Sequence, residues 1–288
     1  TQETLEGLPL GETFNWVDRV SIDLTTKMLA TLFDFPQEQR HLLTHWSDAA
    51  TSDARITAGR GLSIDERRAI MIEMLQTFTE LWHQHKANDR ESFDLIRMLQ
   101  RDPKTENMVD EPLSYLGNLM LLIVGGNDTT RNSMSGGVLH LHDNPSEMAK
   151  LKANPSLIPS MVSEIIRYQT PLPHMRRTAT RDVEINGTVI PKGGRVVLWY
   201  VSGNRDADAI PNADEFIIDR PNVRNHLSFG MGIHRCMRNR LAELQLPIVW
   251  EEIFERFERI EVVGPAVRTC NSFVRGYHEL PVRLHPRI

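Results

Sequence analysis

The stretch HLSFGMGIHRCM, from His226 to Met237, decides how this sequence is interpreted. It places two glycines and a histidine just before Cys236, one of only two cysteines in 288 residues. Glycines allow positive φ angles and a close approach of the backbone to a flat ligand. Cys236 also precedes a helical pattern, and a helix N-terminus stabilises a thiolate. Two interpretations are open for the stretch by itself: a glycine-rich turn around a buried, inert cysteine, or a loop whose anionic sulfur serves as a ligand or a nucleophile.

Other kinds of site fit this stretch less well. A dinucleotide-binding loop requires a third glycine and a preceding strand, and neither is expected here. A zinc site could use His234 and Cys236, but two further ligands at suitable spacing are missing. A cysteine hydrolase would need a separate histidine to orient the thiol. Haem held by a cysteine thiolate is the remaining hypothesis.

Composition narrows the class of protein. With 40% hydrophobic and 25% charged residues, the chain is typical of a globular protein. A net charge of -5 and a pI near 6.1 argue against the basic face that a nucleic-acid partner requires. The most apolar run, 115–126, is shorter than the roughly 20 residues of a membrane span. Two distant cysteines and no signal peptide favour a reducing cytoplasm.

Hydrophobic periodicity predicts a mainly α protein interrupted by a small β-sheet. Helices are expected within 15–85, over about 112–142, from Pro145 onward, and over about 238–257. After Arg181 the period becomes alternating, and the pair Asn186-Gly187 predicts a β-hairpin. His140 follows no ligand pattern and is expected at the surface or in a loop.

The sequence FGMGIHRC (229–236) resembles the haem-binding loop of the cytochrome P-450 superfamily, FGxGxHxC. Three further stretches resemble that superfamily in the same order. GGNDTT (125–130) resembles its oxygen-binding helix, EIIR (164–167) its E-x-x-R motif, and EFIIDR (215–220) the segment that brings a second arginine to the glutamate. The resemblance implies a mainly α P-450 fold, present in part: a single domain over 1–288 that lacks the family's N-terminal part.

The resemblance also implies a role for each matching residue. Cys236 would bind the iron of haem b, while Asp128 and Thr129 would relay protons. The haem would further be held by Arg177, Phe229, Gly230, His234, Arg235, Gly126 and Ala242, with His234 and Arg177 at the propionates. Substrate contacts are expected from Leu121, Val124, Gly125, Pro173 and Met175. A buried structural network is expected from Glu164, Arg167 and Arg220.

Each of these residues also has a plainer explanation. Gly125 and Gly126 each destabilise a helix by roughly 1 kcal/mol relative to alanine. A need for space for dioxygen would explain their presence, but so would an ordinary kink in the helix. Asp128 could be a buried acid paired elsewhere. Glu164 and Arg167, one turn apart, could be a surface pair that contributes little. The apolar residues could be ordinary core.

Longer stretches are similar to the soluble bacterial alkane-hydroxylating cytochromes P-450: LLIVGGNDTTRNSM, SMVSEIIRYQTPLPHMRRTA, WYVSGNRD and NRLAELQL. The similarity implies terminal hydroxylation of medium-chain alkanes or fatty acids, an apolar substrate, and a place in the bacterial cytoplasm. Electrons would come from NAD(P)H through a reductase and a 2Fe-2S ferredoxin. The alternative enzyme is a hydroxylase of terpenoids or steroids.

Two residues depart from the family's pattern. Arg238 stands where family members usually have glycine, two residues after the cysteine. Pro247 falls inside the expected helix, where a proline destabilises the helix by about 3 kcal/mol unless the helix kinks. With the missing N-terminal part, these departures favour a further hypothesis, a fragment that binds haem poorly and is inactive.

Overall fold

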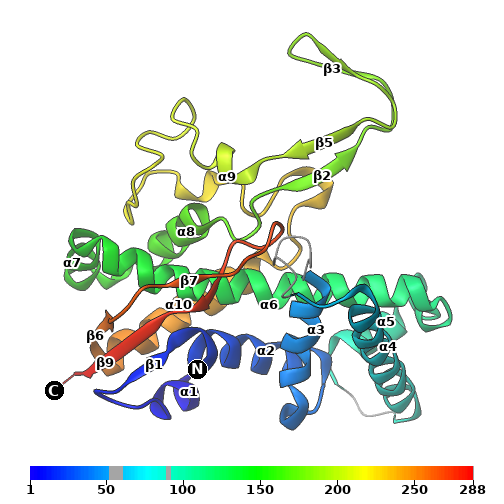
Figure 1. The fold of residues 1–288 in the computed structure, drawn as a ribbon, viewed down its shortest axis with the longest axis horizontal. Coiled ribbons are helices and arrows are strands. Elements are labelled where there is room, and N and C mark those ends of the chain that lie inside the picture. Colours follow the sequence, from blue (N-terminus) through cyan, green and yellow to red (C-terminus); the bar gives the residue numbers. More distant parts are fainter. Residues whose placement is uncertain (52–60, 89–91, 288) are drawn as a thin grey trace.

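The helix α6 (Pro112–Asp143), 32 residues long, runs through the molecule, and helices from both the N-terminal and the C-terminal half of the chain pack along it (Figure 1). The structure is a computed structural model that describes residues 1–51, 61–88 and 92–287. α6 begins with proline at its first position, where the missing N–H is not needed. The helix expected over 112–142 is therefore confirmed.

The other helices and short helical turns are distributed along the whole chain. They are α1 (Gln2–Glu6), η1 (Val17–Ile22), α2 (Asp23–Phe33), η2 (Gln37–Gln39), α3 (His41–Thr51), α4 (Ile64–Ala87), α5 (Leu95–Arg101), η3 (Met108–Asp110), α7 (Pro145–Ala153), η4 (Pro155–Leu157), α8 (Ile158–Gln169), α9 (Tyr200–Gly203), η5 (Val223–Asn225), η6 (Gly232–His234) and α10 (Asn239–Arg256). The mainly α class predicted from the sequence is confirmed. α10 continues through Pro247.

Two hydrophobic cores lie along α6. Near its start, Tyr115, Leu119 and Ile123 pack in a core with α2, α3, α4 and α5. Near its end, Met134 and Val138 pack in a second core with α8, α10 and the C-terminal strands. Between the two cores the buried side chains of α6 are polar: Asn127, Asp128, Thr130, Arg131, Asn132, Ser133 and Ser135. A polar buried segment of a helix needs partners, and the candidate site lies here.

The strands form small antiparallel groups. The largest has the order β1 (Thr13–Asn15), β9 (Pro281–Pro286) and β6 (Phe257–Val262), and it joins the two ends of the chain (Figure 1). The others pair β2 (Met175–Thr178) with β5 (Arg195–Leu198), β3 (Val183–Ile185) with β4 (Thr188–Ile190), and β7 (Val267–Arg268) with β8 (Tyr277–Glu279).

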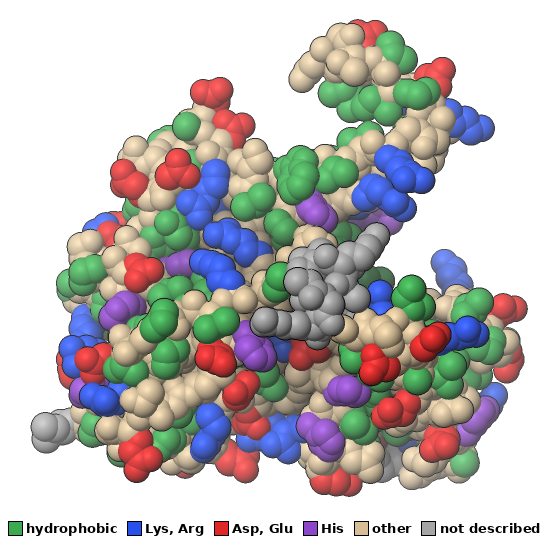
Figure 2. Space-filling model, viewed as in Figure 1, with side chains coloured by type: hydrophobic (Ala, Val, Ile, Leu, Met, Phe, Trp, Pro, Cys, Tyr) green, Lys and Arg blue, Asp and Glu red, His purple; other side chains and the backbone are tan. Residues whose placement is uncertain are grey.

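The predicted hairpin is confirmed, because Asn186 and Gly187 connect β3 to β4 with φ angles of 50° and 78°. Such positive angles suit a two-residue hairpin turn. The hairpin projects from the body of the protein (Figure 1). On the face shown in Figure 2, positively and negatively charged side chains are intermixed. No helix in the described part is long and apolar enough to cross a bilayer.

One expectation about the surface is wrong. His140 lies on α6 and is only 5% exposed, with its ring 4.8 Å from that of Tyr168 and its Nε2 3.1 Å from Gln169 Oε1. Burial lowers the pKa of His140 to about 3. A neutral imidazole with one amide partner is compatible with the core, and its sequence neighbours gave no sign of this.

Candidate active site

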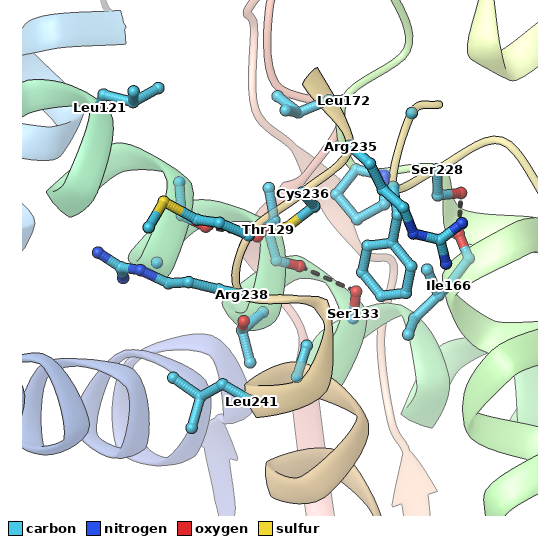
Figure 3. A pocket seen from close by; sticks show the side chains of 18 of the residues that line it. Leu121, Thr129, Ser133, Ile166, Leu172, Ser228, Arg235, Cys236, Arg238 and Leu241 are labelled. Carbon is cyan, nitrogen blue, oxygen red and sulfur yellow. Dashed lines mark hydrogen bonds between the residues drawn. The ribbon is translucent and has the colours of Figure 1, made fainter. Parts of the chain in front are cut away.

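A cavity of about 430 Å³ lies between the polar middle of α6 and the loop that precedes α10. Figure 3 shows the lining residues Thr129 and Cys236 near the centre of the view, with Arg238 extending to the left and Arg235 to the right. α6 contributes residues spaced by four, a spacing that puts side chains on one helix face. They are Leu121, Leu122, Gly125, Gly126, Thr129, Thr130 and Ser133.

The loop that carries the cysteine, residues 226–238, has the tight geometry expected from its glycines. Gly230 and Gly232 have φ angles of 66° and 68°, which few other residues adopt without strain. The Gly230 amide donates to Leu227 O at 2.7 Å, and the Cys236 amide donates to Phe229 O at 2.8 Å. These bonds close the loop and leave the half-buried Cys236 side chain beside the cavity.

Glu164, Arg167 and Arg220 meet in a buried network below this loop. Arg167 donates to the two Glu164 oxygens at 2.7 and 2.8 Å, and Arg220 Nε donates at 3.2 Å. All three side chains are at most 6% exposed. Charged groups so deeply buried are stable only when paired and hydrogen-bonded, and here both conditions are met.

Asn204 connects this network to the cysteine loop. Its backbone oxygen accepts from Arg167 Nη1 at 2.6 Å. Its side chain accepts from the Leu227 amide at 2.6 Å and donates to Ser228 Oγ at 2.8 Å. The chain of contacts runs from the carboxylate of Glu164 to the start of the loop, so the network positions Cys236 without touching it.

On α6, Asp128 and Thr129 are adjacent but face different surroundings. Asp128 is fully buried, accepts from Arg131 at 2.6 Å and from Ser47 Oγ at 3.0 Å, and does not line the cavity. Arg131 is shared with Asp48 at 2.9 Å. Desolvation raises the pKa of Asp128 to about 6, against the opposing effect of Arg131. Thr129 lines the cavity and donates to Gly125 O at 2.9 Å.

Most of the other predicted site residues lie together around the cavity. Its lining includes Leu121, Gly125, Gly126, Met175, Arg177, Phe229, Gly230, His234, Arg235 and Ala242. Val124 and Pro173 are not among the lining residues. Val124 is one position off the face of α6 that carries Leu121 and Gly125, and the Pro173 carbonyl accepts from the Val201 amide at 3.0 Å, at the start of α9.

Several lining residues were not anticipated from the sequence. α2 contributes Met28, Leu29 and Leu32, and Leu172 and Tyr200 lie nearby. These residues have no motif of their own, and an amphipathic helix shows which face is apolar but not what covers it. Their proximity to Cys236 depends on how α2 packs beside α6.

Arg238, which stands where family members usually have glycine, lies in the cavity. Its Nη2 donates to the Leu122 carbonyl of α6 at 2.7 Å. Its Nη1 is buried and has no hydrogen-bond partner among the described residues. A Cβ added at Gly126 would collide with this guanidinium. Burial lowers the pKa of Arg238, and the neighbouring Cys236 opposes that change.

The chemistry of the remaining lining residues fits a haem group. Cys236 offers a soft sulfur ligand for iron, and His234 and Arg177 offer donors for carboxylates. Gly125 and Gly126 leave their own part of the α6 wall without side chains. The position of Arg238 does not fit, because its guanidinium reaches α6 through the space beside Cys236.

Comparisons with known proteins show the family. A family model described as Cytochrome P450 matches residues 57–274. Linalool 8-monooxygenase of Pseudomonas putida is 34% identical over 98% of this chain and 68% of its own length. The structure of cytochrome P450-153 from Novosphingobium aromaticivorans is 47% identical, with a TM-score of 0.88 over 99% of this chain and 68% of that one. CYP153D17 from Sphingomonas is 44% identical, with a TM-score of 0.83 over 98% of this chain and 70% of that one. The chain therefore belongs to the cytochrome P450 family.

Proposed function

We propose that this monooxygenase hydroxylates an aliphatic chain, an n-alkane or a fatty acid of medium length, at its end. The observation that carries the proposal is the cavity between the Cys236 loop and α6, whose substrate side is formed by flexible aliphatic side chains. These include Leu29, Leu32, Leu121, Leu122, Leu172 and Met175. A long saturated chain is bound by burial of apolar surface, which such a lining provides.

Haem b would be held on the other side of the cavity. Cys236 binds the iron, and His234 and Arg177 pair with the propionates, in keeping with their place in the lining. Phe229, Gly230, Arg235, Gly126 and Ala242 supply the remaining contacts. When bound, the haem provides the centre at which dioxygen is activated.

Thr129 and Asp128 would control protons. Thr129 holds a proton at Oγ1 inside the cavity, where its present acceptor is the Gly125 carbonyl. Asp128 lies behind it on the side of α3, and a pKa near 6 allows its carboxyl group to take up and release a proton near neutral pH. In this proposal Asp128 supplies protons from the buried polar side of α6, and Thr129 delivers them.

The external partners follow from the resemblance to the bacterial alkane hydroxylases. An NAD(P)H-dependent reductase and a 2Fe-2S ferredoxin supply the electrons in the bacterial cytoplasm. The second candidate function is hydroxylation of a terpenoid, which the similarity to a linalool monooxygenase over 98% of the chain favours.

The first test is the reduced CO-difference spectrum of the haem-supplemented chain, compared with Cys236→Ser and Cys270→Ser. We expect the red-shifted band of a thiolate ligand in the wild type and in Cys270→Ser, because Cys270 is exposed and outside the cavity. Cys236→Ser should lose that band. An unchanged spectrum in Cys236→Ser would show that another residue binds the iron.

The second test separates the substrate classes by spectral titration. Each added methylene contributes about 0.8 kcal/mol of burial, so dissociation constants in a series of n-alkanoic acids should fall about fourfold per methylene until the cavity is full. Linalool and a steroid are the comparison ligands. Tighter binding of linalool than of every linear chain would favour the terpenoid function.

A further inference from the structure

We propose that Arg238 is an internal plug of the haem cavity: in the haem-free chain its side chain occupies haem space, and haem binds only after this side chain has moved out. The inference rests on the proposed haem site and concerns how that site is filled. Arg238 bridges from the cysteine loop to the Leu122 carbonyl and to Gly126 on α6. Cys236 and Gly126 both line the cavity, so a planar group bound to the Cys236 sulfur and Arg238 in this position compete for the same volume.

The surroundings of the guanidinium favour a plug over a permanent structural contact. Arg238 has one hydrogen bond, to a carbonyl inside a helix, and its Nη1 is buried without a partner among the described residues. Arg167 and Arg220, which are equally large cations, each have a carboxylate and several backbone acceptors. A partly buried cation with so few partners loses little when it swings to solvent, because water then satisfies all of its donors.

The position also explains why Arg238 is not simply a propionate ligand. Its guanidinium lies where a Cβ of Gly126 would be, and the other side chain closest to that point is the apolar Leu29. Figure 3 shows the Arg238 side chain extending from the loop toward the Leu121 end of the cavity, whereas Arg235 points to the opposite side, near Ser228. A carboxylate paired with Arg238 in place would have to sit on the apolar wall.

The experiment is a titration of the haem-free chain with haemin, followed by Soret absorbance, for the wild type, Arg238→Ala and Arg240→Ala. Arg240 lies two residues after Arg238, is exposed and is not among the residues that line the cavity. Arg240→Ala therefore removes the same charge without opening the cavity. We expect Arg238→Ala to bind haemin at least tenfold more tightly than the wild type, and Arg240→Ala to match the wild type. Far-UV circular dichroism checks folding. If the alanine variant does not fold, Arg238→Lys, with its shorter side chain, should still bind haemin more tightly than the wild type.

The other outcomes have distinct meanings. Equal or weaker haemin binding by Arg238→Ala, with binding by the wild type intact, would overturn the plug and make Arg238 neutral or a haem ligand. An equal gain in Arg240→Ala would overturn it too, since net charge would then be the cause. Absence of haemin binding in every variant would instead contradict the proposed function, because no haem site would remain to be plugged.

Discussion

The Glu164 network and the cysteine loop lie side by side but differ in which groups they bury. The network buries charged groups, whereas the loop exposes large apolar side chains. Around Glu164 the charges are buried, and each has partners within the chain. The neighbouring loop exposes large apolar side chains, with Ile233 97% and Met237 77% exposed, and contains the incompletely paired Arg238. In the Glu164 network the protein itself supplies the partner of every charged group. The cysteine loop leaves apolar side chains exposed and a polar group unpaired, as expected of a surface that binds a ligand.

The largest change in stability should come from Glu164→Gln, which removes the carboxylate at the centre of the buried network. The neutral amide leaves two buried arginines without a carboxylate, and removing one partner of a buried ion pair costs about 3–5 kcal/mol of unfolding free energy. Urea denaturation of the wild type and the variant measures this loss of unfolding free energy. Glu258→Gln removes the exposed partner of Lys152 and should leave the midpoint nearly unchanged. Similar midpoints for both variants would show that the network does not hold the fold.

A somewhat smaller effect is expected from the pH dependence of Asp128. Its pKa is about 6 in the folded chain and 3.8 as the reference value, so the folded state holds the proton more tightly. The stability of the wild type should therefore fall as pH rises from about 4 to about 6, by at most about 3 kcal/mol, relative to Asp128→Asn. Thermal unfolding of both proteins across this range tests it. Parallel curves would mean that Asp128 keeps an ordinary pKa.

The smallest effect compares two adjacent glycines on α6. A Cβ at Gly125 meets nothing within 4 Å, whereas one at Gly126 would collide with Arg238 and lie 2.8 Å from Leu29 Cδ2. Gly125→Ala should stabilise the haem-free chain by up to about 1 kcal/mol through helix propensity. Gly126→Ala should destabilise it by about 1 kcal/mol because of overpacking. Equal shifts in melting temperature would indicate that Arg238 and Leu29 yield freely.

Local features were predictable where short-range physics dominates. The Asn186-Gly187 turn, the long helix that begins at Pro112 and the positive φ angles at Gly230 and Gly232 depend on neighbouring residues only, and all were expected. Residues with a motif were also expected near one another, and most of them line one cavity. His140 was misplaced because nothing nearby in the sequence indicates that Tyr168 and Gln169 cover it.

What the sequence alone determined is the main helices, the Asn186-Gly187 hairpin and the family, since periodicity, turn residues and four motifs in order are local properties of the chain. Tertiary structure decided which side of α6 each polar residue faces: Asp128 toward α3 and Arg131, Thr129 into the cavity. It also decided that α2 supplies part of the cavity wall and that Arg238 reaches Leu122, more than a hundred residues away. Such contacts depend on the packing of distant segments, and one helical step of about 100° separates a cavity residue from a buried ion pair.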